Sequence, residues 1–242
     1  MKISFCTTCM NRLFHLKETY PNNLSSAESY ADAEFVLLDY GGKDGLQTWV
    51  ESELSAYLQS GRLKFIRAEG PRYWVAAHAK NIAHREATGE ILCNLDADIT
   101  IPPGFCEFVA ESFSSRNIVM SFASEDAMGN NGCAGFVAAR REHFYSVNGY
   151  DESINLGWGY DDLNYQFRVR MHNNLKLFTP PPIISCIPHA NEVRTANCQL
   201  KDIHETMAVS RNICEDAALR KDYIANKGVD WGVANIVSNL SA

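Results

Sequence analysis

Two aspartates, Asp96 and Asp98, follow the apolar run Ile91–Leu95 and are separated by a single alanine. A short apolar run bounded by a glycine and a pair of prolines predicts a buried strand, with these carboxylates at its C-terminal tip. In extended backbone, residues i and i+2 point the same way. Paired carboxylates suit Mg²⁺ or Mn²⁺, and open α/β sheets bind ligands at this edge. The spacing therefore predicts a metal site at a sheet edge.

The elements that must position these residues alternate along the first hundred residues. Strands are expected at Ile3–Cys6, Phe35–Leu38, Leu63–Ile66 and Ile91–Leu95, and helices at Arg12–Tyr20, stopped by Pro21, at Leu46–Gln59 and at Trp74–Ala87. Such alternation predicts βαβ units and a parallel sheet. Because strands joined through helices share one direction, Asp39, after the second strand, is expected at the same edge as Asp96 and Asp98.

The second half is less regular. Strands are expected at Asn117–Ala123 and Phe136–Ala139, helices at Arg141–Val147 and Asp161–His172, extended segments at Leu175–Phe178 and Ile183–Ile187, and helix from Gln199 onward. The polar stretch Ser124–Gly135 predicts a loop, in which Gly129–Gly132 is either a lid over a substrate or a plain surface loop. We expect one α/β domain over residues 1–190 and a helical extension over residues 191–242 packed on it.

Composition restricts the class of protein and its location. The 242 residues carry a formal charge of −7, which argues against a nucleic-acid partner. Neither a signal peptide nor an apolar run of membrane-spanning length is visible, so we expect a cytoplasmic protein, with peripheral membrane contact left open. The eight cysteines include one C-x-x-C pair, Cys6 and Cys9, and no second pair for zinc. We expect reduced structural thiols rather than a redox motif.

Several short segments form an ordered set of motifs. In chain order they are Ser4–Thr8 with Asn11-Arg12, Glu34–Tyr40, Lys80-Asn81 and Gly89–Asp98. On these segments the chain resembles the nucleotide-sugar-dependent glycosyltransferases of family 2. The resemblance covers about residues 1–190. It implies the GT-A fold, a Rossmann-like mixed, mainly parallel sheet flanked by helices.

A later pair of segments resembles a more specific group. Val147–Glu152 and Leu156–Asp162 look like the paired signature of the β-1,4-galactosyltransferases and related bacterial polymerase domains. The chain departs from that signature at Tyr160, where glycine is usual, and at Asp161, where glutamate is common. These departures bear on the donor sugar more than on the reaction class.

The resemblance implies a role for each matching residue. It places Thr7, Arg12, Asp39, Lys80, Asn81 and Asp96 at the nucleotide donor, Asp98, Asp96 and His189 at a metal, Trp158 and Asp161 at the acceptor or sugar, and Asp162 as the catalytic base. Mn²⁺ or Mg²⁺ would offset the charge of a diphosphate leaving group. The alternatives are a surface histidine at position 189, helix capping by Asp161 and Asp162, and solvated charges at Arg12 and Lys80.

The expected function is metal-dependent transfer of galactose or N-acetylgalactosamine from a UDP-sugar to a glycan or glycolipid acceptor, with inversion. A retaining transferase on the same fold and a nucleotide-sugar-binding subunit without turnover are the alternatives. A nucleotidyltransferase would need a glycine-rich basic loop after the first strand, and Thr7–Arg12 contains no glycine.

Overall fold

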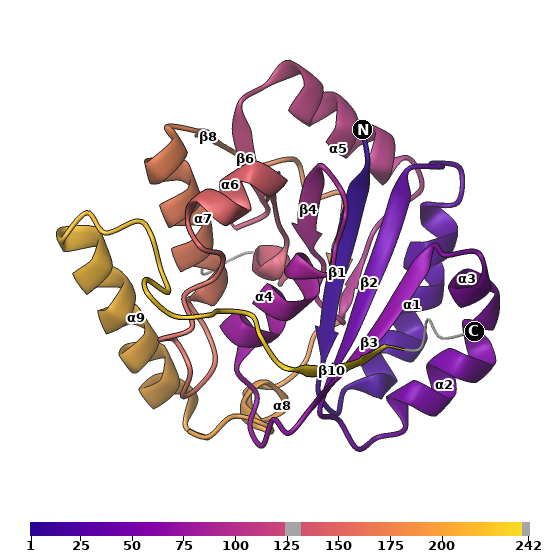
Figure 1. Cartoon of the computed structure of the whole chain (residues 1–242), viewed down its shortest axis with the longest axis horizontal. Coiled ribbons are helices and arrows are strands. Elements are labelled where there is room, and N and C mark those ends of the chain that lie inside the picture. The colour runs from indigo at the N-terminus through magenta and orange to yellow at the C-terminus, as the bar shows by residue number, and fades with distance from the viewer. Residues whose placement is uncertain (124–131, 239–242) are drawn as a thin grey trace.

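The structure is a computed structural model that describes residues 1–123 and 132–238. An eight-stranded sheet runs through the molecule in the order β10-β3-β2-β1-β4-β7-β6-β8 (Figure 1). Its strands are β1 (Ile3–Cys9), β2 (Ala33–Tyr40), β3 (Leu63–Glu69), β4 (Ile91–Asn94), β6 (Ile118–Ser121), β7 (Val137–Arg140), β8 (Lys176–Phe178) and β10 (Asn235–Ser238). A separate small ladder pairs β5 (Ile99–Thr100) with β9 (Ser185–Cys186).

The sheet is mixed and mainly parallel, as predicted. Strands β3, β2, β1 and β4 are parallel, β7 is antiparallel to both β4 and β6, and β8 is parallel to β6. The central strand β1 therefore ends beside β2 and β4, so that Asp39 and the Asp96–Asp98 turn follow strands that end at one edge. This is the edge at which open α/β sheets bind ligands.

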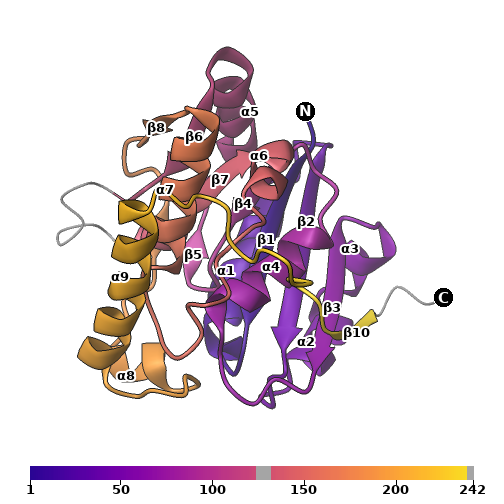
Figure 2. The same cartoon turned by 60° about the vertical axis from the view of Figure 1, so that its left-hand side comes forward.

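Helices cover both faces of the sheet (Figures 1 and 2). They are α1 (Leu13–Ser26), α2 (Leu46–Glu53), α3 (Ser55–Gln59), α4 (Ala76–Arg85), α5 (Phe105–Ser115), α6 (Arg141–Ser146), α7 (Asp161–Asn173), α8 (Asn191–Thr195) and α9 (Ile203–Leu219), with a 3₁₀ turn, η1 (Cys133–Gly135). Phe5 of β1 packs in one apolar cluster with α1, α2 and α5, whereas Cys6 packs in a second with α4, α6 and α7. This alternation follows from the two-residue period of a strand.

Two predicted helix boundaries are wrong. Helix α1 continues through Pro21 to Ser26, because the buried side chains of Tyr20 and Leu24 on either side of the proline pack into the core. One missing N–H bond is outweighed by this burial. The predicted helix 46–59 is divided into α2 and α3 at Leu54, whose φ of −114° and ψ of 15° interrupt the helix.

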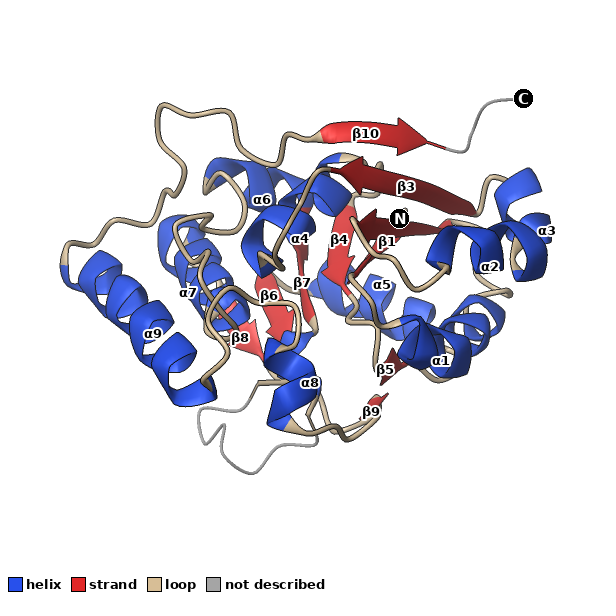
Figure 3. Ribbon diagram, turned by 90° about the horizontal axis from the view of Figure 1, so that it is seen from below, coloured by secondary structure: helices blue, strands red, loops and turns tan. Residues whose placement is uncertain are grey.

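The C-terminal segment contains a strand that the sequence patterns did not indicate. Helix α9 lies beside α7, and the chain then crosses the molecule to add β10 antiparallel to β3 (Figure 3). The helices α5 and α8 were also not predicted. The predicted lid Gly129–Gly132 lies, apart from Gly132, outside the described residues. In the described part of the chain, every helix is too short or too polar to cross a bilayer.

Candidate active site

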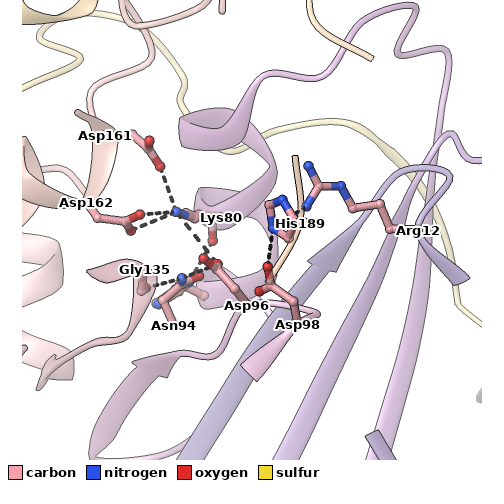
Figure 4. A network of polar contacts seen from close by, with 10 residues as sticks. Arg12, Lys80, Asn94, Asp96, Asp98, Gly135, Asp161, Asp162 and His189 are labelled. Carbon is pink, nitrogen blue, oxygen red and sulfur yellow. Dashed lines mark hydrogen bonds and ion pairs between the residues drawn. The ribbon is translucent and has the colours of Figure 1, made fainter. Parts of the chain in front are cut away.

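The side chains of Asp98 and His189 meet at the carboxyl edge of the sheet. The Nε2 atom of His189, which follows β9, lies 2.5 Å from Oδ2 of Asp98 (Figure 4). Arg12, just before α1, places Nη1 3.5 Å from the same His189 nitrogen and donates through Nη2 to the Val193 carbonyl at 2.7 Å. Burial alone would raise the pKa of Asp98, but the hydrogen bond and charge of His189 lower it below the usual value. Asp98 is therefore an ionised ligand candidate.

Asp96 lies on the other side of the same turn. Its side chain is 35% exposed, its Oδ1 accepts a 2.8 Å hydrogen bond from Asn94, and the Lys80 ammonium is 4.0 Å away. The Asn94 amide also donates to the Gly135 carbonyl at 2.6 Å. A Cβ at Gly135 would overlap the Asp96 carboxylate, so the absence of a side chain at Gly135 leaves room for this carboxylate.

Lys80 connects this carboxylate to the second acidic pair. Its Nζ lies 2.6 Å from Oδ2 of Asp161 and 2.7 and 2.8 Å from the two oxygens of Asp162 (Figure 4). Burial alone would lower the pKa of Lys80, but the carboxylates raise it, so this buried lysine is charged. One ammonium cannot balance three carboxylates. Burial, and then the charge of Asp161, raise the pKa of Asp162 well above its usual value.

The backbone before α7 aims these two aspartates. Tyr160, the position at which the resembling enzymes usually have glycine, has a φ of +65°, and Gly159 has a φ of +104°. The left-handed backbone explains why glycine suits position 160. Asp161 and Asp162 then occupy the first turn of α7, where their charge complements the helix dipole.

The Asn81 side chain bonds to the loop before α7 and not to the acidic cluster. Its side chain is fully buried and exchanges hydrogen bonds with the backbone N–H (2.7 Å) and carbonyl (2.9 Å) of Tyr150. It also donates to Glu152 at 2.8 Å. Asn81 therefore fixes the loop before α7 relative to α4, which carries Lys80.

Asp39 and Thr7 do not join this cluster. Asp39 is 1% exposed, and its oxygens accept hydrogen bonds from the Gly42 N–H at 2.7 Å and from Arg67 Nη1 at 2.9 Å. Burial raises the pKa of Asp39 although the Gly42 N–H and Arg67 oppose it. The Thr7 hydroxyl is buried within the core. At Trp158, the Arg194 guanidinium lies 5.0 Å from the ring centroid.

Sequence reasoning did not identify four residues next to the site: Asn94, Arg67, His15 and Asn197. Asn197 donates to the Met10 carbonyl and accepts from Asn11, both at 2.9 Å, while its own carbonyl accepts from the Trp74 N–H at 2.7 Å. It therefore joins the turn after β1, the loop before α4 and the segment after α8. The polar Asn94 at the end of an apolar run was the one signal available for this group.

The residues present fit a divalent cation in part. Among the described residues, no three His, Cys, Asp or Glu side chains are gathered as a ready metal-binding group. Asp98 and His189 contact each other directly, however, and Asp96 lies on the same turn with its side chain 35% exposed. Mg²⁺ and Mn²⁺ commonly take only one or two carboxylates from a protein and complete their shell with water and substrate phosphate. An incomplete protein ligand set is what such an ion requires.

Comparison with solved structures shows the same fold. The chain superposes on the mannosyltransferase PcManGT from Pyrobaculum calidifontis, in complex with GDP-Man and Mn²⁺, with a TM-score of 0.66 and 18% identity, over 91% of this chain and 64% of that one. It superposes on residues 1–349 of S. aureus TarS, in complex with UDP-GlcNAc, with a TM-score of 0.63 and 15% identity, over 87% of this chain and 65% of that one. It superposes on GalNAc-T7, with UDP, GalNAc and Mn²⁺, with a TM-score of 0.66 and 16% identity, over 90% of this chain and 48% of that one. The chain thus spans less than two thirds of each of these proteins.

Comparison by sequence shows the family. No curated protein matches the chain significantly. The family model for glycosyl transferase family 2 matches residues 4–189, which include both acidic pairs and His189. With the GT-A-like fold and this match, the chain belongs to glycosyl transferase family 2, whose members are nucleotide-sugar-dependent glycosyltransferases.

Proposed function

We propose that this protein transfers galactose or N-acetylgalactosamine from a UDP-sugar to a glycan or glycolipid acceptor, depends on Mn²⁺ or Mg²⁺, and inverts the anomeric centre. The observation that carries the proposal is the position of Lys80, whose ammonium contacts Asp161 and Asp162 at 2.6–2.8 Å and lies 4.0 Å from Asp96. It brings the candidate base close to the turn that carries the metal carboxylates. The choice of sugar rests on the resemblance to β-1,4-galactosyltransferases.

The chemistry divides between the two acidic pairs. The bond from the anomeric carbon to the diphosphate breaks while the acceptor hydroxyl oxygen bonds to the opposite face of that carbon. Asp162 takes the hydroxyl proton, and its raised pKa suits a general base. A cation held by Asp98 and His189 would offset the charge on the departing diphosphate. Asp96 would bind the ribose or the cation's water, and Asp161 the sugar or acceptor hydroxyls.

The nucleotide side consists of Arg12, Asp39 and Lys80. Asp39 already accepts from Gly42 and Arg67, and each carboxylate oxygen retains a further lone pair for the imide N–H of uracil. Arg12 and Lys80 supply positive charge on either side of the metal turn. PcManGT is complexed with GDP-Man and TarS with UDP-GlcNAc, so the same fold accommodates either base in those proteins.

The test is a screen of UDP-Gal, UDP-GalNAc, UDP-GlcNAc and GDP-Man for nucleotide release with Mn²⁺, with a chelator and with Asp98→Asn as controls. We expect release from a UDP-sugar that needs the metal, and a product of inverted configuration by NMR. Release from GDP-Man alone would overturn the nucleotide assignment. A product of retained configuration would favour the retaining mechanism and remove Asp162 from the role of base.

A further inference from the structure

One face of α1 forms a buried polar stripe along the metal-binding turn. His15, Thr19 and Asn23 are spaced four residues apart and are exposed by only 2%, 1% and 1%. Thr19 donates to the Ala97 carbonyl at 2.7 Å, and Asn23 donates to the Ile99 carbonyl at 2.8 Å. Residues at this spacing share one face of a helix. The stripe therefore fixes α1 against the segment that carries Asp96 and Asp98.

His15, at the end of this stripe, packs on His189. The two ring centroids are 5.2 Å apart and the ring planes are tilted by 37°. The Nδ1 atom of His15 has no hydrogen-bond partner among the described residues. Sequence analysis assigned no role to His15, and it takes no part in the proposed chemistry. The contact of His15 with the site is the packing of its ring on His189.

Three polar groups lie near the nitrogens of the His189 ring. Its Nε2 faces Asp98 at 2.5 Å and Arg12 at 3.5 Å, and its Nδ1 lies 3.5 Å from the Ala190 carbonyl, which is at the limit of hydrogen bonding. Metal-binding histidines usually have their second nitrogen fixed by a strong partner, which sets the orientation of the ring. Here the His15 ring packs against the His189 ring, with the two planes tilted by 37°.

We propose that His15 is a positioning residue that holds the His189 ring in the orientation that binds the divalent cation beside Asp98. The proposal rests on the proposed function, in which His189 is a metal ligand. His15 acts through its ring face and not as a ligand itself.

The experiment compares Mn²⁺ binding, by electron paramagnetic resonance in the presence of UDP, for four single variants and one double variant of the full chain. His15→Ala removes the ring face, His15→Phe keeps a flat ring without nitrogen, and His189→Ala removes the ligand. His143→Ala is the matched control, because His143 is also a mostly buried histidine whose Nδ1 has no partner among the described residues.

We expect His15→Ala to raise the Kd for Mn²⁺ by about 10-fold or more, the effect typical of losing a residue that orients a metal ligand. His15→Phe and His143→Ala should remain within about 3-fold of the parent. The double variant His15→Ala, His189→Ala should bind Mn²⁺ no more weakly than His189→Ala alone. The reason is that His15 acts only through His189, which is already absent in the single variant. Parental affinity in His15→Ala, or equal losses in His15→Ala and His15→Phe, would overturn the proposal.

A second measurement needs no metal. Aromatic NOE spectra of the metal-free protein should show contacts between the rings of His15 and His189, and their absence overturns the inferred packing. The failures are distinguishable. If His189→Ala binds Mn²⁺ like the parent, the ligand assignment in the proposed function is wrong and the role of His15 falls with it. If only His15→Ala binds like the parent, the positioning role alone is wrong.

Discussion

At the scale of single residues, the main feature of the site is that one buried lysine faces three carboxylates. The Lys80 ammonium is 4% exposed and faces Asp161 and Asp162, with Asp96 at 4.0 Å. Burial, and then the negative charge that exceeds the single lysine, raise the pKa of Asp162, which suits its proposed role as a general base, while Asp98 stays ionised beside His189. The two acidic pairs are thus prepared for different tasks by their neighbours.

Asp162→Asn separates chemistry from binding. The amide preserves the size of the side chain and its hydrogen bonding at the start of α7, but it cannot take a proton. We expect transfer to fall by about 10²–10⁴-fold, the usual contribution of a general base. UDP affinity, measured by calorimetry on the same preparation, should change by no more than a few fold. Transfer at the parental rate would place the base elsewhere.

The pH dependence of transfer should report the raised pKa of Asp162. Only the ionised carboxylate accepts a proton, so kcat/KM should rise with pH through a pKa above that of an ordinary aspartate. Asp161→Asn removes a neighbouring negative charge, which lowers the pKa of Asp162 and moves the acid limb to lower pH. The check is the normalised pH profile of both proteins, and superimposable acid limbs would contradict it.

Asp98→Asn should weaken nucleotide binding as well as rate. If the diphosphate is held through a cation, the loss of an ionised ligand lowers UDP affinity by about 10-fold or more in Mn²⁺. In excess chelator, the parent and Asp98→Asn should bind UDP equally weakly. Calorimetric titrations of both proteins with UDP provide the measurement. Parental UDP affinity in chelator would exclude the cation as the link.

At the scale of elements, the site depends on close fits between segments distant in sequence. A Cβ at Gly135 of the 3₁₀ turn η1 would overlap the Asp96 carboxylate, so the position of that side chain depends on glycine here. A Cβ at Gly157 would overlap Thr206 of α9, so this approach also requires a residue without a side chain.

Gly135→Ala should act on Asp96 without unfolding the chain. The new methyl group displaces the Asp96 carboxylate from its contacts with Asn94 and Lys80. We expect UDP affinity to fall by about 10-fold, similar to Asp96→Asn, with a loss of stability of about 1–3 kcal/mol, as for overpacking. Calorimetry and urea unfolding measure the two effects. Parental UDP affinity together with a large loss of stability would mean that Gly135 serves only packing.

The sequence predicted those parts of the fold that depend on local pattern. The apolar runs of β2 and β4 and the period of the first helices were sufficient to predict the parallel half of the sheet. They also predicted which edge carries the carboxyl ends of its strands. Helix boundaries at Pro21 and Leu54 were missed because burial, not local propensity, decides them. His15 was missed because a histidine within a helical pattern carries no sign of which loop it faces.

At the scale of the whole molecule, the C-terminal segment packs against the part of the fold that carries the proposed site residues. Glu152 accepts hydrogen bonds from Asn81 at 2.8 Å and from the Gly232 N–H at 2.7 Å. The Trp231 ring packs on Phe144 at 5.5 Å and under Arg85 at 5.2 Å. Residues beyond the family match therefore contact the loop that precedes α7.

Trp231→Ala tests this dependence. Loss of a half-buried tryptophan should destabilise the protein by about 2 kcal/mol, below the range for a fully buried one. Transfer activity should fall as well, because the loop that positions Asp161 and Asp162 loses support. Val229→Ala is the control, because Val229 is 62% exposed and should leave both properties unchanged. Equal stability of the two variants in urea would show that the segment is only appended.

The pairing of β10 with β3 has a consequence for biosynthesis. Strand β3 is made early, but the partner that covers its outer edge is translated after all the other strands of the sheet. Until then the nascent chain presents an open parallel-sheet edge, which is a template for misassembly between chains. Pairing across so long a sequence separation also slows folding. On the ribosome, this protein should therefore rely on chaperones until β10 emerges, although most of its apolar core is encoded earlier.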